Sequence, residues 1–172
     1  MEPLVETVVE DDRWRVVGLE ALADRAVRAA LAEMALPEAG LTLCVMGGDD
    51  ARIAGLNAAF RGKPVPTNVL SWPAWDLSPE QPGAAPDVPE AGSAEKPESL
   101  GDIALAWETC AKEAAAAEKP LSDHATHLIV HGLLHLLGYD HLTDPDAARM
   151  EALEVRILAT LGISDPYEGA EM

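Results

Sequence analysis

An α+β fold is compatible with the sequence, because four segments have the residue pattern of β-strands and five have the pattern of α-helices. The chain has 172 residues, which suits one domain with a sizeable core or one domain plus a tail. Hydrophobic residues make up 48% of the chain, an ordinary share for a globular protein. We therefore expect residues 1–172 to form a single domain.

Strands and helices are expected to alternate in the first half of the chain. The expected strands are short apolar runs at 4–9, 41–46 and 68–72. Between them we expect a helix at 18–35, where apolar residues recur at helical spacing, and another at about 51–60. Pro37 ends the first helix, and Asp49 or Asp50 can cap the second.

Residues 73–99 interrupt this pattern with six of the chain's thirteen prolines, six acidic residues and one lysine. Such a segment cannot bury enough apolar area to offset its ordering entropy, so we expect a mobile, acidic, Pro-rich loop. A fourth strand is expected at 101–107. The remaining elements are helices at about 108–118, 121–137 and 144–161, followed by a frayed tail at 163–172.

The chain is strongly acidic, because 30 Asp and Glu residues outnumber 12 Lys and Arg residues and give a formal net charge of −18. This balance argues against general binding to nucleic acids or anionic membranes, but it leaves room for a local basic patch. The N-terminus does not resemble a signal peptide, and no segment is long and apolar enough to span a bilayer. Cys44 and Cys110 are expected to be buried, reduced thiols, with a disulfide or a metal site as the alternative. We therefore expect a cytoplasmic protein without membrane partners.

The stretch HGLLHLLGYDH has three histidines at the spacing of a zinc-hydrolase motif, H-E-x-x-H-x-x-G-x-x-H. On a helix, His131 and His135 are four residues apart and project from one face. Gly138 can take the left-handed conformation that ends a helix, so that His141 closes on the same ion. Three imidazole nitrogens with one open position form a catalytic type of zinc site. The usual general base is missing, because Gly132 stands where that motif has Glu.

Other polar side chains are expected beside this site. His127 lies one helical turn before His131, where it can hydrogen-bond near the ion or help bind substrate; as a fourth ligand it would close the site. Asp140 can act as a general base or accept a hydrogen bond from a histidine N–H, and we favour the acceptor role. His124 lies another turn earlier and is expected to be solvated.

The same stretch resembles the signature of the YbeY family, bacterial endoribonucleases that are also called rRNA maturation factors. Segments similar to that family follow in the same order at 56–73, 100–106 and 150–158. The first of these segments carries Arg61 at the family's basic position. The resemblance runs from about residue 40 to residue 161, and the segment 73–99 is longer than we expect for the family.

The resemblance implies an α+β, zincin-like fold, in which about five helices pack on a small mixed β-sheet of about four strands and the metal-binding helix lies in the core. It implies a metal-dependent endoribonuclease that cuts single-stranded RNA and uses one metal ion, usually taken to be Zn2+. The implied process is 3′-end maturation of 16S rRNA, together with ribosome quality control. The implied partners are the precursor of small-subunit rRNA, the small ribosomal subunit and its assembly factors.

The implied chemistry needs no carboxylate base. A zinc ion held by His131, His135 and His141 lowers the pKa of a water molecule towards about 7, or polarises a phosphoryl oxygen. Arg61 is the natural stabiliser of the charge that develops on the phosphate, because its planar fork matches phosphate geometry. Attack by water and attack by the 2′-hydroxyl of RNA both remain open, and imidazole ligands also suit nickel, copper and iron.

Two other functions remain open at this point. A degenerate zinc metallopeptidase would need a base from elsewhere, with Glu151 or Glu154 as candidates, although both are expected on the solvated or packing face of the last helix. A non-catalytic, metal-stabilised ribosome assembly factor would use its histidines only to hold the fold. The acidic loop 73–99 can restrain promiscuous RNA binding or serve as a spacer, and we favour the spacer.

Overall fold

The computed structural model describes residues 4–79, 81, 84–93, 95–141 and 143–167. Within these residues the strands are β1 (Val5–Val9), β2 (Leu41–Gly48), β3 (Val69–Pro73) and β4 (Glu98–Ala106). The helices are α1 (Arg13–Val17), α2 (Leu19–Glu33), α3 (Asp50–Arg61), α4 (Trp107–Ala116), α5 (Leu121–Leu136) and α6 (Asp144–Thr160). The fold is therefore α+β, as expected.

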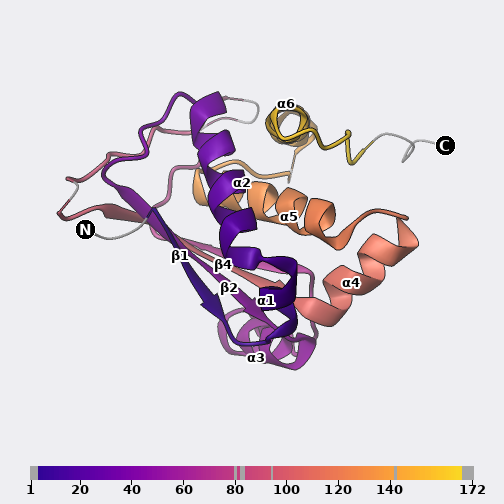
Figure 1. Ribbon diagram of the computed structural model, residues 1–172. Helices are drawn as coiled ribbons and strands as arrows, with labels where there is room; N and C mark the ends of the chain where they lie inside the picture. Colours follow the sequence, from indigo (N-terminus) through magenta and orange to yellow (C-terminus); the bar gives the residue numbers. More distant parts are fainter. Residues whose placement is uncertain (1–3, 80, 82–83, 94, 142, 168–172) are drawn as a thin grey trace.

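The strands form one mixed sheet in the order β1-β2-β4-β3, and Figure 1 labels the first three of these strands. β1 pairs with β2 and β2 pairs with β4 in parallel, whereas β3 pairs with β4 antiparallel. β1 and β3 are therefore the edge strands. Among the described residues, each edge strand leaves one row of backbone groups without a strand partner.

Helices cover both faces of the sheet, with most of them on one side (Figure 1). The side chains of β4 alternate between these faces. Ile103 and Leu105 join the larger core cluster with residues of α2, α5 and α6, whereas Ala104 and Ala106 join a smaller cluster with Ile53 of α3. The strand is apolar on both faces because it lies between two layers of helices.

Helix α5 is held tightly against the sheet. Ile129 and Leu133 are completely buried in the larger cluster. Gly132 approaches β4 so closely that a Cβ atom there would lie 3.2 Å from the Cγ2 atom of Ile103. His131 and His135 lie on another face of the same helix, and both line a cavity beside β3. The sheet contact of α5 thus fixes the direction in which the two imidazoles point.

Helix α1 was not expected from the sequence, so the described residues contain one helix more than the five expected. It has only five residues, too few for a periodic apolar pattern to be recognised. Trp14 stabilises it, because this side chain is fully buried and its Nε1–H donates a 2.9 Å hydrogen bond to the Gly48 carbonyl.

The acidic segment 73–99 differs from the expectation at its C-terminal end, because β4 begins at Glu98, earlier than expected. Glu98 extends the parallel pairing with Leu41 of β2. The described residues between β3 and β4 contain neither helix nor strand, as expected for a loop. This loop is nevertheless attached to the fold, since the Gly92 N–H donates a 2.8 Å hydrogen bond to the Gly40 carbonyl.

The C-terminal segment is packed where the structure describes it, although the sequence suggested a frayed tail from residue 163. Ile163 packs against the larger core cluster. The Tyr167 hydroxyl donates a 2.7 Å hydrogen bond to Glu154 of α6. Residues 168–172, the remainder of the expected tail, lie outside the described residues.

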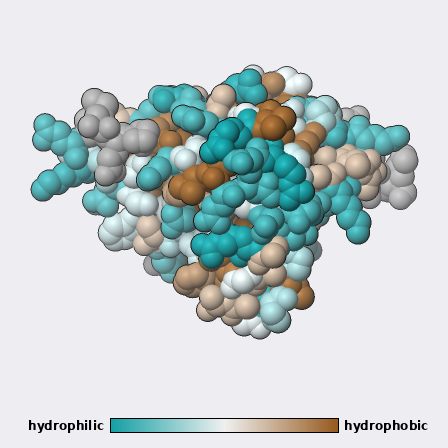
Figure 2. Space-filling view, turned by 60° about the horizontal axis from the view of Figure 1, so that its bottom comes forward, coloured by the Kyte–Doolittle hydropathy of each residue, from teal (hydrophilic) through white to brown (hydrophobic). Residues whose placement is uncertain are grey.

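The surface is mainly polar on the face that Figure 2 shows, where hydrophilic residues predominate and apolar residues form small separate patches. Among the described residues, no helix is long and apolar enough to cross a membrane. Cys44 is partly buried and Cys110 is fully buried, and both are free thiols. Burial raises the pKa of the Cys110 thiol to about 12, which keeps it protonated and unreactive.

Candidate metal centre

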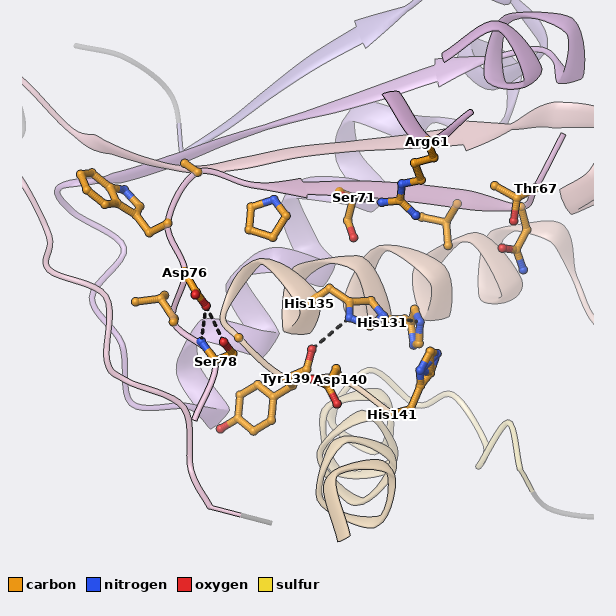
Figure 3. A pocket seen from close by; sticks show the side chains of 17 residues that line it. Arg61, Thr67, Ser71, Asp76, Ser78, His131, His135, Tyr139, Asp140 and His141 are labelled. Carbon is orange, nitrogen blue, oxygen red and sulfur yellow. Dashed lines mark hydrogen bonds between the residues drawn. The ribbon is translucent and has the colours of Figure 1, made fainter. Parts of the chain in front are cut away.

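The structure brings together the three histidines that the sequence singles out as metal ligands. His131 and His135 project from α5 one turn apart, and their Nε2 atoms lie 3.0 Å from each other. His141 approaches from the turn after the helix (Figure 3). One ring nitrogen from each histidine lies within 4.8 Å of the other two, so all three can bind one ion.

The turn between α5 and His141 requires glycine. Gly138 has φ +100°, a backbone conformation that other residues rarely adopt. A Cβ atom at this position would also lie 2.6 Å from the backbone carbonyl of Leu77. The Tyr139 N–H then donates a 2.9 Å hydrogen bond to the Leu134 carbonyl and closes the helix end. This geometry returns the chain towards α5 and places His141 beside the other two rings.

The outer nitrogens of the two helical histidines are both hydrogen-bonded. His131 Nδ1 lies 3.0 Å from Glu154 Oε1, and His135 Nδ1 lies 2.9 Å from the backbone carbonyl of Tyr139. An ionised carboxylate and a carbonyl can only accept hydrogen bonds, so each Nδ1 must carry a proton. In the neutral rings, each Nε2 atom therefore carries a lone pair and no proton.

Two such lone pairs at 3.0 Å repel each other unless a cation lies between them. A second proton on His135 is disfavoured, because burial and the neighbouring His131 lower the pKa of His135 to about 4. A metal ion bound by neutral imidazoles resolves the repulsion, and imidazole nitrogen is a common zinc ligand. The donor set of this chain therefore fits a divalent metal such as zinc.

From the sequence, Glu154 is expected only as a candidate base for a peptidase, on the solvated or packing face of the last helix, and its contacts with two histidines of α5 are not foreseen. It is 0% exposed. Its Oε1 accepts hydrogen bonds from His127 Nε2 at 2.9 Å and His131 Nδ1 at 3.0 Å, and its Oε2 accepts from the Tyr167 hydroxyl at 2.7 Å. Burial alone would raise the pKa of Glu154, but these hydrogen bonds outweigh it and lower the pKa to about 2.

The metal-site histidines open onto a cavity of about 690 Å3, and Arg61 lines the same cavity. Arg61 is the last residue of α3 and is exposed. Its Nη2 donates a 2.9 Å hydrogen bond to the Ser71 carbonyl on the edge strand β3. This contact holds the guanidinium at the cavity wall across from the histidines (Figure 3) and leaves further N–H donors for a ligand.

The remaining predicted residues lie around this cluster. Asp140 lines the cavity next to His141. From the sequence, Asp140 is expected to accept a hydrogen bond from a histidine N–H. At His131 and His135 the acceptors are instead Glu154 and the Tyr139 carbonyl.

The two earlier histidines of α5 also make carboxylate contacts. His127 hydrogen-bonds to Glu154 through Nε2, and it is not among the three described histidines whose nitrogens can share one ion. His124 is not simply solvated, because its side chain is only 15% exposed and its Nε2 lies 2.9 Å from Glu113 Oε1.

The first residues of the acidic loop form one wall of the cavity. Trp75, Asp76 and Leu77 all line it, and the Ser78 N–H donates a 3.1 Å hydrogen bond to the Asp76 carboxylate (Figure 3). We favoured a spacer role for the whole segment 73–99. Its N-terminal part instead contributes directly to the shape of the site.

The missing glutamate of the zinc-hydrolase motif has a structural explanation, because position 132 faces Ile103 of the sheet rather than the cavity. We expect Gly132→Glu to lower the free energy of unfolding by about 3 kcal/mol or more, since it would bury an unpaired carboxylate. Gly55→Glu is the matched control, because Gly55 lies in α3 with open space around it. Urea unfolding measures the stability of both variants. Equal stability would contradict the close approach of position 132 to Ile103.

Comparisons with known proteins give a consistent result. The family described as "Endoribonuclease YbeY" matches residues 7–162. A protein named Endoribonuclease YbeY from Cereibacter sphaeroides is 61% identical over 97% of this chain and 100% of its own length. Another of the same name, from Dinoroseobacter shibae, is 60% identical over 95% of this chain and 90% of its own. The solution structure of TM1509 from Thermotoga maritima shares the fold, with a TM-score of 0.54, 18% identity and 95% coverage of both chains.

Proposed function

This chain belongs to the endoribonuclease YbeY family, and we propose that it cuts single-stranded RNA at a zinc ion held by His131, His135 and His141. Family membership at this identity makes it an endoribonuclease, a hydrolase that acts on RNA. We further propose that it acts in the cytoplasm, on the precursor of small-subunit rRNA, in 16S rRNA 3′-end maturation and ribosome quality control. Its partners would then be the small ribosomal subunit and its assembly factors.

One observation carries the proposal for the site: the Nε2 atoms of His131 and His135 lie 3.0 Å apart and open, with His141, onto a cavity that Arg61 also lines. When bound there, zinc supplies a Lewis acid that activates water near neutral pH and polarises a phosphoryl oxygen. The three imidazoles leave room for a further ligand, because the cavity side of the cluster is open.

The protein's own residues are proposed to bind the phosphate, orient the histidines and accept a proton. Arg61 is placed to bind a phosphodiester, and its charge stabilises the extra negative charge that develops on the equatorial oxygens. The hydrogen bonds at the two Nδ1 atoms keep His131 and His135 in the tautomer that offers Nε2. Asp140 stays a proposed base in the cavity, where it can take a proton from the attacking group, whether that group is water or the 2′-hydroxyl of RNA.

Electrostatics restrict how RNA can bind. The net charge of −18 repels a polyanion, and Asp76 and Asp140 line the cavity. Attraction must therefore be local and arise from the metal and Arg61, so few phosphates are contacted. Because these contacts are with phosphates, we expect the affinity for RNA to fall clearly as the salt concentration rises.

Chelation tests the proposal directly. We expect EDTA to abolish cleavage of a labelled single-stranded RNA, and one equivalent of zinc to restore it. At a free zinc concentration of about 1,000 times Kd, zinc also raises the free energy of unfolding by about 4 kcal/mol. Duplex RNA and casein are assayed alongside. Equal RNA cleavage in EDTA would refute metal dependence, and cleavage of casein would favour the peptidase alternative.

Neither alternative function gains support from the described residues. For a peptidase, Glu154 is already engaged, because both of its oxygens accept hydrogen bonds inside the core. A purely structural metal site would be closed by a fourth side chain, whereas this cluster borders a cavity of about 690 Å3.

A further inference from the structure

We propose that Glu154 is a positioning residue for the metal ligand His131, and that Tyr167 holds Glu154 in place. This inference rests on the proposed metal site. It assigns a role to the C-terminal segment, which reaches the site through a single buried carboxylate.

The first argument is the direction of the hydrogen bonds. A carboxylate has no proton to donate, so contact with Glu154 Oε1 at 3.0 Å requires the proton of His131 to be on Nδ1. The Nε2 atom then keeps its lone pair and points towards His135 Nε2. Without this acceptor, His131 would be free to place its proton on Nε2, and that tautomer cannot bind a metal through Nε2.

The second argument is the cost of burying this charge. Glu154 is 0% exposed, and an ionised carboxylate in such a place is strongly unfavourable unless every oxygen is hydrogen-bonded. His127 and His131 satisfy Oε1, and the Tyr167 hydroxyl satisfies Oε2 at 2.7 Å. The ring of Tyr167 also packs edge-on against His127, with ring centroids 5.7 Å apart. Tyr167 therefore fixes the rotamer of the carboxylate that orients His131.

The third argument is charge balance. The ligands of the proposed site are neutral imidazoles, so they leave the charge of a divalent cation uncompensated. Glu154 supplies a negative charge at the outer nitrogen of one ligand, which makes that imidazole a stronger donor to the metal. The carboxylate thus contributes to affinity without occupying a coordination position that the reaction needs.

A second histidine–carboxylate pair in α5 serves as an internal control. His124 Nε2 lies 2.9 Å from Glu113 Oε1, a histidine–carboxylate contact of almost the same length whose carboxylate is 41% exposed. His124 is not among the three histidines that can share an ion. If Glu154 only connects helices, the two pairs should behave alike when mutated.

The experiment compares Glu154→Gln with Glu113→Gln by competition for zinc against a fluorescent chelator, without RNA. Glutamine matches the shape of glutamate and can satisfy the same neighbours, so Glu154→Gln removes mainly the negative charge. We expect its zinc affinity to fall about 10- to 100-fold, and that of Glu113→Gln to change less than about twofold. Unchanged zinc affinity in Glu154→Gln, or equal losses in both variants, would overturn the proposal.

Tyr167→Phe keeps the test decisive if Glu154→Gln fails to fold. It removes only the hydroxyl, and we expect a smaller loss of zinc affinity in the same direction. NMR of 15N-labelled imidazoles in the zinc-free protein gives an independent measurement, with His131 expected as the Nδ1–H tautomer. An Nε2–H tautomer in the wild type would refute the positioning role. If the variants lose zinc affinity as expected but the wild-type protein does not cleave RNA, the proposed nuclease function is refuted and the positioning role of Glu154 is not.

Discussion

Replacing His135 with alanine is expected to abolish zinc binding and RNA cleavage together. The variant removes one of the two Nε2 donors that lie 3.0 Å apart, so two histidines remain for the ion. Removal of a group that only supports a ligand already costs about 10- to 100-fold in affinity or activity, and we expect a larger loss for the ligand itself. Isothermal titration with zinc and cleavage of single-stranded RNA measure the two effects.

His124→Ala is the matched control for this variant. It removes an imidazole from the same helix α5, where the ring contacts Glu113 and does not belong to the three-histidine group. We expect zinc binding and cleavage to remain within about twofold of the wild type. RNA cleavage by His135→Ala at the wild-type rate would exclude the three-histidine site as the reaction centre.

Arg61→Ala is expected to lower kcat for RNA cleavage by about 100- to 1,000-fold, because it removes a preorganised donor from the charge that develops on the phosphate. Zinc affinity should not change, since Arg61 contacts the Ser71 carbonyl rather than a histidine. Arg61→Lys should recover only part of the rate, because an ammonium keeps the charge but lacks the planar fork. Single-turnover cleavage of a short labelled RNA measures these rates.

Arg52→Ala is the control for the loss of positive charge. Arg52 lies in the first turn of the same helix α3, where its guanidinium pairs with Glu10 at 2.9 Å. This variant changes the net charge as much as Arg61→Ala does, so it separates long-range repulsion of RNA from a local effect. An equal loss of rate in both variants would contradict the role of Arg61 in the cavity.

The elements that the sequence predicts well are those whose signals are local. The strands and the five longer helices are marked by apolar periodicity, by Pro37 after α2 and by the Asp49 cap, whose side chain accepts from the Arg52 N–H. The histidine cluster follows from the four-residue spacing of His131 and His135 and from a glycine turn. Such signals involve only a few neighbouring residues, so they can be recognised without knowledge of the tertiary structure.

What the sequence does not reveal depends on contacts between distant segments. Glu154 reaches His131 from another helix, and Tyr167 reaches Glu154 from beyond the end of α6. A weak signal was present, because Glu154 shares its helical face with the buried residues Met150, Leu153, Ile157 and Leu158. A carboxylate within an apolar stripe indicates a buried partner, but the stripe does not identify that partner.

X-ray absorption spectroscopy of the zinc-loaded protein tests the central claim most directly, namely that three imidazoles bind one ion and leave one position open. We predict one zinc per chain, with three imidazole nitrogens at about 2.0–2.1 Å and one light-atom ligand from solvent. A sulfur ligand, a fourth imidazole or an added carboxylate from the protein would contradict the account, because the position needed for RNA chemistry would be closed.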